Sequence, residues 1–350
     1  MNKFLAEMLE QPAAIEKVLA HYTAPGGMNG LEEVKKVLGK GDTRQVIFTG
    51  MGSSYFVSHA AMTLFNELKI GAFAVNASEL LHYNFSLLDR KTLLVCTSQS
   101  GESFEILEIL KKLPPTVCTV GITNEEESTL ARKADIALFC HSGKEEMTST
   151  KTYVSTSLVT FILGWFLADR WDDRTMKRVE QLVPKFKAAL TDYSHWVDPM
   201  LDFLGEVQTL QIIARGPAFS TASQGGLMFK EALKIPATGI LGGEFRHGPM
   251  EMVGEGFKAI LFAGRGKTLD QSMKMAGDIA RFGGRVLLIT NTPEKGLPPG
   301  IMTCFVEEPD EYLFSVQGII PVQLFIDAYA KRRGFEAGSF SRGAKVTAIE

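Results

Sequence analysis

Ten short apolar runs, arranged as two series of five, constrain this chain more than any other feature of its sequence. The first series has starts 27, 20, 24 and 19 residues apart, at Gln45, Ala72, Thr92, Thr116 and Asp135. The second has starts 29, 20, 27 and 16 residues apart, at Thr209, Thr238, Lys258, Arg285 and Ile301. Each run has the length of a β-strand, and segments of helical period separate the runs, which is the pattern of a parallel α/β sheet. The near match of the two series predicts one plan used twice.

Shorter echoes support the duplication. The fourth runs end in the related tetrapeptides GITN (121–124) and LITN (288–291), and each first run ends in a glycine. We therefore predict an α/β fold of two doubly wound, flavodoxin-like domains in tandem, each with a five-stranded parallel sheet. The first domain is expected over 1–195, with N-terminal helices and bridging helices from about 153 to 204, and the second over 196–350, ending in a glycine-containing tail.

The charge balance argues against several classes of partner. The 350 residues carry 37 Lys and Arg against 40 Asp and Glu, a formal net charge of −3, which offers no basic field for nucleic acid. The N-terminus has glutamates among its apolar residues and resembles no signal peptide. The longest uncharged stretch, Thr152–Ala168, is 17 residues long, which favours a buried core helix over a membrane span. We expect a cytoplasmic protein that binds neither membrane nor nucleic acid.

Cofactor and metal motifs are missing from the sequence. The four cysteines, Cys96, Cys118, Cys140 and Cys304, lie in or beside apolar runs without CxxC spacing, so they are predicted to be small core residues. Residues 50–55, GMGSSY, depart from a dinucleotide-binding GxGxxG because Tyr55 replaces the third glycine. We therefore expect no metal and no cofactor.

The third run of the first series leads into the hydroxyl-rich segment TSQSGES, residues 97–103. In an open parallel sheet, ligands bind beyond the carboxyl ends of the strands, and hydroxyls at a helix N-terminus suit a phosphate. An ordinary helix cap would explain the same residues. A second hydroxyl cluster, residues 148–152, precedes the long apolar helix and could either add donors for the ligand or cap that helix.

Two residues in the second half are candidates for acid–base chemistry. Glu231 lies in the helical stretch GGLMFKEALKI, where Lys230 beside it also allows a solvent-exposed helical turn. His247 lies in the turn-rich segment GGEFRHGP, residues 242–249, where an imidazole that titrates near neutral pH is suited to proton transfer.

Seven motifs in order resemble the tandem sugar isomerase (SIS) domain family, and most closely the isomerase half of the glutamine-dependent glucosamine-6-phosphate synthases. They are MLEQPAAIEKVL, GMGSSY, TSQSGES, STK (149–151), FKEALK, GGEFRHGPMEMV and the terminal AKVTAIE. The resemblance implies a site for a 6-phosphosugar. It assigns the phosphate to Ser54, Ser98, Gln99, Ser100 and Ser103 and a sugar contact to Ser149.

The same resemblance implies the catalytic roles. Glu231 matches the glutamate that shuttles a proton between C1 and C2, and His247 matches the histidine that opens the sugar ring. Lys345 matches a C-terminal lysine that can form a Schiff base with an open-chain ketose. The family's histidine comes from the neighbouring subunit, so the resemblance implies a homodimer with shared active sites.

Departures from the synthases point to a related activity. No glutaminase domain precedes the matched region, so no ammonia from glutamine is expected, and Met228 stands where the synthases have a lysine. We expect an enzyme acting at C1 and C2 of a 6-phosphorylated amino sugar, of the glucosamine-6-phosphate deaminase or isomerase type. The alternatives are a fructosamine-6-phosphate deglycase, a non-catalytic sugar-phosphate regulator, or a partner of a separate glutaminase subunit.

Overall fold

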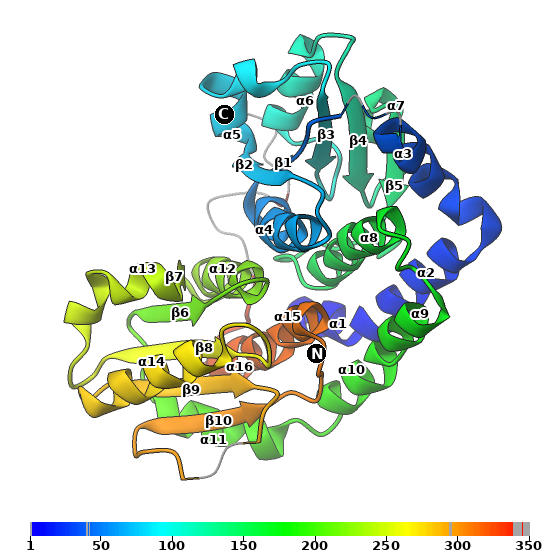
Figure 1. The fold of residues 1–350 in the computed structure, drawn as a ribbon. Helices are drawn as coiled ribbons and strands as arrows, with labels where there is room; N and C mark the ends of the chain where they lie inside the picture. The colour runs from blue at the N-terminus through cyan, green and yellow to red at the C-terminus, as the bar shows by residue number, and fades with distance from the viewer. Residues whose placement is uncertain (1, 40, 42, 294–295, 339–344, 346–350) are drawn as a thin grey trace. The chain divides into compact units, whose positions relative to one another are not determined.

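The computed structural model describes residues 2–338 and Lys345, apart from residues 40, 42, 294 and 295. The chain forms two compact units. The first unit comprises residues 10–183 together with Lys345, and the second comprises residues 2–9 and 184–338. Each unit contains one five-stranded sheet with helices on both faces (Figure 1).

The sheet of the first unit is wholly parallel and has the strand order β2-β1-β3-β4-β5. Its strands are β1 (Gln45–Gly50), β2 (Ala72–Asn76), β3 (Thr92–Thr97), β4 (Cys118–Thr123) and β5 (Ile136–Phe139). All six residues of β3 are buried, because helices cover both of its faces. Alternate side chains of β1 therefore enter different cores: Phe48 contacts Phe65 of α4 edge-to-face, whereas Ile47 packs with Leu80 and Ile106.

The described part of the first unit contains α-helices and two short 3-10 helices, η1 and η2. They are α2 (Gln11–Thr23), η1 (Pro25–Met28), α3 (Asn29–Gly39), α4 (Gly52–Glu67), α5 (Ala77–His82), η2 (Phe85–Leu87), α6 (Phe104–Lys112), α7 (Thr129–Lys133), α8 (Lys151–Leu167) and α9 (Asp173–Glu180). Helix α8 is the predicted core helix, and it packs against α4, α2 and α3. Helix α10 (Leu182–Leu190) spans the change from one unit to the other.

The second unit repeats the topology, with strand order β10-β9-β8-β6-β7 and all pairs parallel. Its strands are β6 (Leu210–Ala214), β7 (Ala237–Leu241), β8 (Lys258–Ala263), β9 (Arg285–Thr290) and β10 (Ile301–Phe305). Its helices are α1 (Lys3–Leu9), α11 (Ser194–Leu204), α12 (Ala218–Met228), η3 (Phe229–Leu233), α13 (Gly242–Arg246), η4 (Pro249–Met252), α14 (Leu269–Arg281), α15 (Glu311–Gln317) and α16 (Ile319–Arg332).

The predicted fold is confirmed. Each of the ten apolar runs coincides with a strand to within two residues at its start, and both sheets have the flavodoxin-like order 2-1-3-4-5 when numbered within their own unit. The predicted bridging stretch forms α8 to α11. The expected boundary at 195/196 lies within α11, and the tail residue Lys345 belongs to the first unit.

Three of the four cysteines are buried in the core, as predicted. Cys96, Cys140 and Cys304 are buried, Cys118 is half-buried, and all four are free thiols. Burial raises the pKa of each of the three buried thiols to about 12, so none is a thiolate near neutral pH.

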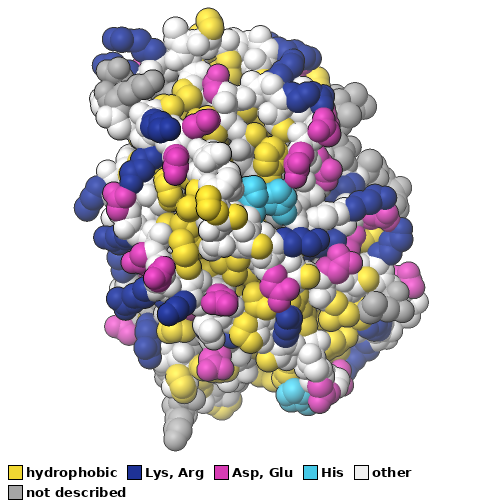
Figure 2. Space-filling model, turned by 90° about the vertical axis from the view of Figure 1, so that its right-hand side faces the viewer, with side chains coloured by type: hydrophobic (Ala, Val, Ile, Leu, Met, Phe, Trp, Pro, Cys, Tyr) yellow, Lys and Arg dark blue, Asp and Glu magenta, His cyan; other side chains and the backbone are white. Residues whose placement is uncertain are grey.

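One long apolar helical segment is buried, and charges of both signs share the surface (Figure 2). Residues Glu311–Arg332 are long and apolar enough to cross a membrane, but 94% of their most apolar stretch is buried inside the structure, as in a core helix. On the face shown in Figure 2, Lys and Arg side chains are interspersed with Asp and Glu, in keeping with the net charge of −3.

Candidate active site

The loop between β3 and α6 is held in shape by its own serines. Ser98 Oγ lies 2.9 Å from Ser103 Oγ and accepts a hydrogen bond from the Gly101 N–H at 3.1 Å. Ser100 Oγ accepts one from the Glu102 N–H at 3.2 Å. Ser103 directly precedes α6, and within the described residues its side chain caps none of the helix N–H groups. The N-terminus of α6 therefore keeps backbone donors and a positive dipole end, which suit an oxyanion.

Ser54 lies beside this loop, in the first turn of α4. A Cβ added to Gly50 at the end of β1 would lie 2.9 Å from both Ser54 Cβ and the Thr97 carbonyl oxygen. The glycine thus allows α4 to start close against the end of β3. The structure brings Ser54 together with the segment that begins at Ser98.

Asn124, the last residue of the repeated tetrapeptide GITN (121–124), connects the loops that follow β3, β4 and β5. Its N–H donates to the Gln99 carbonyl oxygen at 3.0 Å. Its side-chain Oδ1 accepts from the Ser142 N–H at 2.7 Å, and its Nδ2 donates to the Gly143 carbonyl oxygen at 3.0 Å. Asn124 therefore ties the loop after β3 to the loop after β5. Sequence reasoning missed this positioning role, although the repeated tetrapeptide was its signal.

The second unit contains the same bridge around a different loop. Asn291 Oδ1 accepts from the Arg265 N–H at 2.6 Å, and its Nδ2 donates to the Glu308 carbonyl oxygen at 2.6 Å. We call residues 98–103, between β3 and α6, the serine loop. The loop at the corresponding place in the second unit is Gly264–Thr268, with the sequence GRGKT. A Cβ added to Gly266 would lie 2.4 Å from Glu311 Oε1, so a carboxylate of the protein itself packs against this loop.

Gly101 is the tightest point of the serine loop. Its φ is +64°, and an added Cβ would lie 2.1 Å from Ser128 Oγ and 2.4 Å from Ser128 Cβ. Gly143 has a similar φ of +72°, but an added Cβ there meets nothing within 4 Å.

Gly101→Ala is therefore expected to reduce the free energy of unfolding by about 1–3 kcal/mol more than Gly143→Ala, because both variants carry the same backbone strain and only the first adds a clash. Urea denaturation of the two variants measures the difference. An equal loss would show that the loop does not need close contact with Ser128.

Ser149 and Lys345 meet in the first unit. Lys345 Nζ donates to Glu145 Oε2 at 2.6 Å and to the Met147 carbonyl oxygen at 2.6 Å, and it lies 3.5 Å from Ser149 Oγ. These partners all belong to the segment that leads into α8. The structure thus places the predicted Schiff-base lysine against the predicted sugar-contacting loop.

Glu145 is the central residue of this cluster, and the sequence did not single it out. Its side chain is fully buried, and Oε1 accepts hydrogen bonds from the Thr150 N–H at 2.9 Å, the Thr150 hydroxyl at 3.1 Å and the Thr152 N–H at 3.2 Å. The Thr152 hydroxyl donates to Oε2. One carboxylate therefore satisfies the hydroxyl cluster and the tail lysine together.

Glu231 lies in an irregular helical turn. The five residues Phe229–Leu233, which follow α12, form a π-helix, and the chain leaves it through Lys234 with φ of +59°. Turns of this kind widen the helix and are frequent at functional sites. The Glu231 side chain is half-buried, which is more enclosed than the exposed helical turn that the sequence also allowed.

His247 follows α13 directly and is exposed. The preceding residue, Arg246, pairs with Asp278 of α14 at 2.6 Å, which fixes the end of α13. A Cβ added to Gly242 would lie 2.8 Å from Arg215 Nε, so the Arg215 side chain covers the start of the same helix. Arg215 is a further residue of this region that the sequence analysis missed.

The structure gathers some of the predicted residues and not others. Ser54 lies with the serine loop, and Ser149 lies with Lys345, both in the first unit. Glu231 and His247 belong to the second unit, where Glu231 precedes β7 and His247 follows it. A strand of five residues spans about 16 Å, so these two residues lie at opposite ends of β7.

Comparisons with known proteins agree with this architecture. Glutamine–fructose-6-phosphate aminotransferases [isomerizing] of Methanothermobacter thermautotrophicus and Thermococcus kodakarensis are each 27% identical to this chain over 99% of its length. The chain spans 57% and 58% of the length of these two relatives.

Solved structures show the same fold. The C-terminal domain of glucosamine-fructose-6-phosphate aminotransferase from Francisella tularensis has a TM-score of 0.84 and 22% identity, over 97% of this chain and 98% of that one. Glucosamine-6-phosphate deaminase from Thermotoga maritima has a TM-score of 0.73 and 23% identity, over 96% of each chain. The SIS domain matches residues 42–167 and 204–308, one match in each sheet, and the chain therefore belongs to the SIS domain family.

Proposed function

We propose that this protein is a cytoplasmic enzyme acting at C1 and C2 of a 6-phosphorylated amino sugar, of the glucosamine-6-phosphate deaminase or isomerase type. The observation that carries the proposal is the position of Lys345. Its amine lies 3.5 Å from Ser149 Oγ and 2.6 Å from a buried carboxylate, where it can meet a sugar carbonyl. A regulator that only binds sugar phosphates needs no amine at that position.

In the proposed mechanism, the first unit holds the anion. The phosphate accepts hydrogen bonds from the hydroxyls of Ser54, Ser98, Ser100 and Ser103, the amide of Gln99 and the N-terminus of α6. Because the net charge of the chain is −3, there is no overall positive charge to attract an anionic substrate, and such local donors must bind it. This grip positions the other end of the sugar for chemistry.

Glu231 acts as the base that moves a proton between C1 and C2, and His247 donates and accepts a proton when the sugar ring opens. Both roles need groups that exchange protons near neutral pH. Glu231 must also reach two adjacent carbons from one position.

Lys345 forms a Schiff base with the open-chain ketose. Its amine attacks C2, the carbon–nitrogen double bond forms, and the carbonyl oxygen leaves as water. Only the neutral amine is a nucleophile, so the ammonium must first lose a proton. Glu145, 2.6 Å away, is placed to accept that proton.

The activity is tested with two substrates. Glucosamine-6-phosphate is incubated with the protein without glutamine, and release of ammonia and fructose-6-phosphate is followed. A fructosamine-6-phosphate is incubated in parallel, and release of free amine is followed. We expect ammonia from the first substrate. Release of amine from the second alone would assign the deglycase activity instead, and no turnover of either would contradict the proposal.

A homodimer with shared sites follows from the resemblance and fits the separation of Glu231 and His247 along β7. Mixing inactive Glu231→Gln and His247→Gln subunits is expected to restore about a quarter of wild-type activity, because half of the random dimers are mixed and each mixed dimer has one intact site. Activity is measured after dissociation and reassembly. Mixtures that remain inactive while dimers form would show that each subunit completes its own site.

A further inference from the structure

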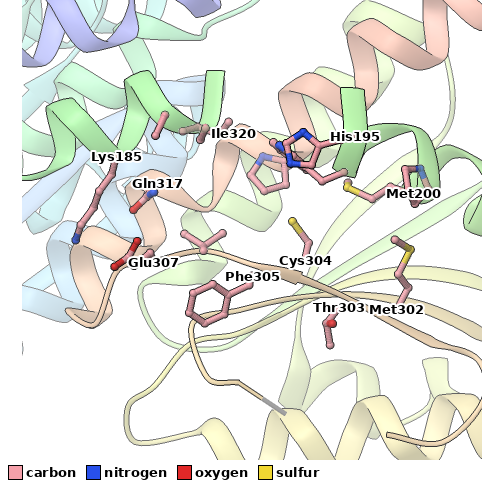
Figure 3. A pocket seen from close by; sticks show the side chains of 16 residues that line it. Lys185, His195, Met200, Met302, Thr303, Cys304, Phe305, Glu307, Gln317 and Ile320 are labelled. Atoms are coloured by element: carbon pink, nitrogen blue, oxygen red, sulfur yellow. The ribbon is translucent and has the colours of Figure 1, made fainter. Parts of the chain in front are cut away.

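A pocket in the second unit lies apart from every residue discussed as substrate-binding or catalytic. Its volume is about 560 Å³, within the range of about 300–1,000 Å³ that small-molecule sites occupy. It is formed between α10, α11, the β10 strand and the α15–α16 helices, and β10 is an edge strand of its sheet (Figure 3). Most of its lining is apolar, including Trp196, Met200, Met302, Cys304, Phe305 and Ile320.

Gln317 provides an unsatisfied acceptor in this lining. The residue is 5% exposed, and its Oε1 is buried without a hydrogen-bond partner among the described residues. A buried carbonyl oxygen without a donor costs free energy unless a ligand or a water molecule supplies a hydrogen bond. A ligand N–H or O–H that reaches Oε1 would remove this deficit.

The charges beside Gln317 disfavour an anionic ligand such as a phosphosugar. Lys185 lines the pocket close to Gln317 in Figure 3, but its Nζ is paired with Glu308 Oε2 at 2.7 Å, and the Glu308 side chain is 3% exposed. The Glu307 carboxylate lines the same end. At this end of the described lining the positive charge of Lys185 is already paired, so the site favours a neutral molecule.

The aromatic and sulfur-containing side chains favour a flat ligand. Phe305 lies on the β10 edge, is 55% exposed and lines the pocket. Trp196, Met200 and Met302 line the same cavity. Aromatic rings and thioethers both make favourable contacts with planar rings.

We propose that this pocket is a second binding site, for a neutral aromatic nitrogen heterocycle whose N–H donates a hydrogen bond to Gln317 Oε1 while its ring packs against Phe305 and Trp196. The site is independent of the proposed enzymatic activity, and its test requires no sugar turnover.

Three probes test the proposal on the full chain: indole, adenine and nicotinamide, with 1-methylindole as the matched probe that lacks the N–H donor. Saturation-transfer NMR titrations give their dissociation constants. We expect at least one N–H probe to saturate below about 10 mM. We also expect Gln317→Leu to weaken indole binding about tenfold and to leave 1-methylindole binding unchanged.

Phe305→Ala and Phe282→Ala form the matched pair of variants, because both rings are about half exposed and only Phe305 lines the pocket. We expect weaker binding of every probe in Phe305→Ala and unchanged binding in Phe282→Ala. Failure of all three probes to bind, or equal binding by both variants, would overturn the proposal. Sedimentation provides a further check: a dimer that Phe305→Ala dissociates, without probe binding, would assign this face to contact with a second copy instead.

Discussion

Glu231→Gln is expected to lower the turnover of the 6-phosphosugar by about 10²–10⁴-fold, the range that a positioned general base contributes. Glutamine has nearly the same shape as glutamate, so the π-helical turn over Phe229–Leu233 is retained, but its amide cannot accept the proton. Two measurements test this: the steady-state turnover number, and the exchange of solvent deuterium into C1 and C2 followed by NMR. Both should fall together.

Glu255→Gln provides the matched control, since Glu255 is an exposed glutamate of the same unit that lies outside the proposed site. It should keep wild-type turnover. Thermal unfolding of both variants should match the wild type and so separate lost chemistry from lost structure. Glu231→Gln turnover within a few fold of the wild type would remove Glu231 from the mechanism.

Glu145→Ala is expected to have the largest effect on stability, a loss of about 3–5 kcal/mol in the free energy of unfolding. Removing the carboxylate leaves the Lys345 ammonium and the donors of Thr150 and Thr152 without their acceptor. Buried donors that lose a charged acceptor carry their full desolvation cost. Urea denaturation monitored by circular dichroism measures the loss.

Two further variants separate the contributions. Glu146→Ala removes the neighbouring glutamate, which pairs with the exposed Lys144, and should cost at most about 1 kcal/mol. Glu145→Gln keeps an acceptor for the threonines but removes the charge facing Lys345, so it should lose less stability than Glu145→Ala and still lose turnover. Similar losses from Glu145→Ala and Glu146→Ala would contradict the central role of Glu145.

The strands were predictable because the pattern that forms each strand lies in the strand's own residues. A buried parallel strand such as β3 needs a continuous apolar run, and the TLLVCT that supplies it stands out in the sequence without knowledge of its neighbours. The repeated spacing also predicted the doubly wound fold class, whose right-handed crossovers allow few strand orders, and the structure shows which order is adopted.

The positioning residues were not predictable in the same way, because their roles depend on partners distant in the chain. Glu145 meets Lys345 across 200 residues, and Asn124 reaches Ser142 after a whole strand has intervened. Nothing in the local pattern distinguishes Glu145 from Glu146. The π-helical turn at Glu231 also escapes periodicity, because one widened turn hardly changes the spacing of apolar residues.

The matching asparagine bridges have a practical consequence for redesign. Asn124 and Asn291 make similar hydrogen bonds at the same edge of the two sheets. The loop beside Asn124 is the serine loop, whereas the loop beside Asn291 is GRGKT, with the Glu311 carboxylate packed against it. The same arrangement of strands and asparagine is therefore compatible with two different loop sequences. We therefore expect that loop sequences can be exchanged between the two copies while the asparagine and the strands on either side are kept.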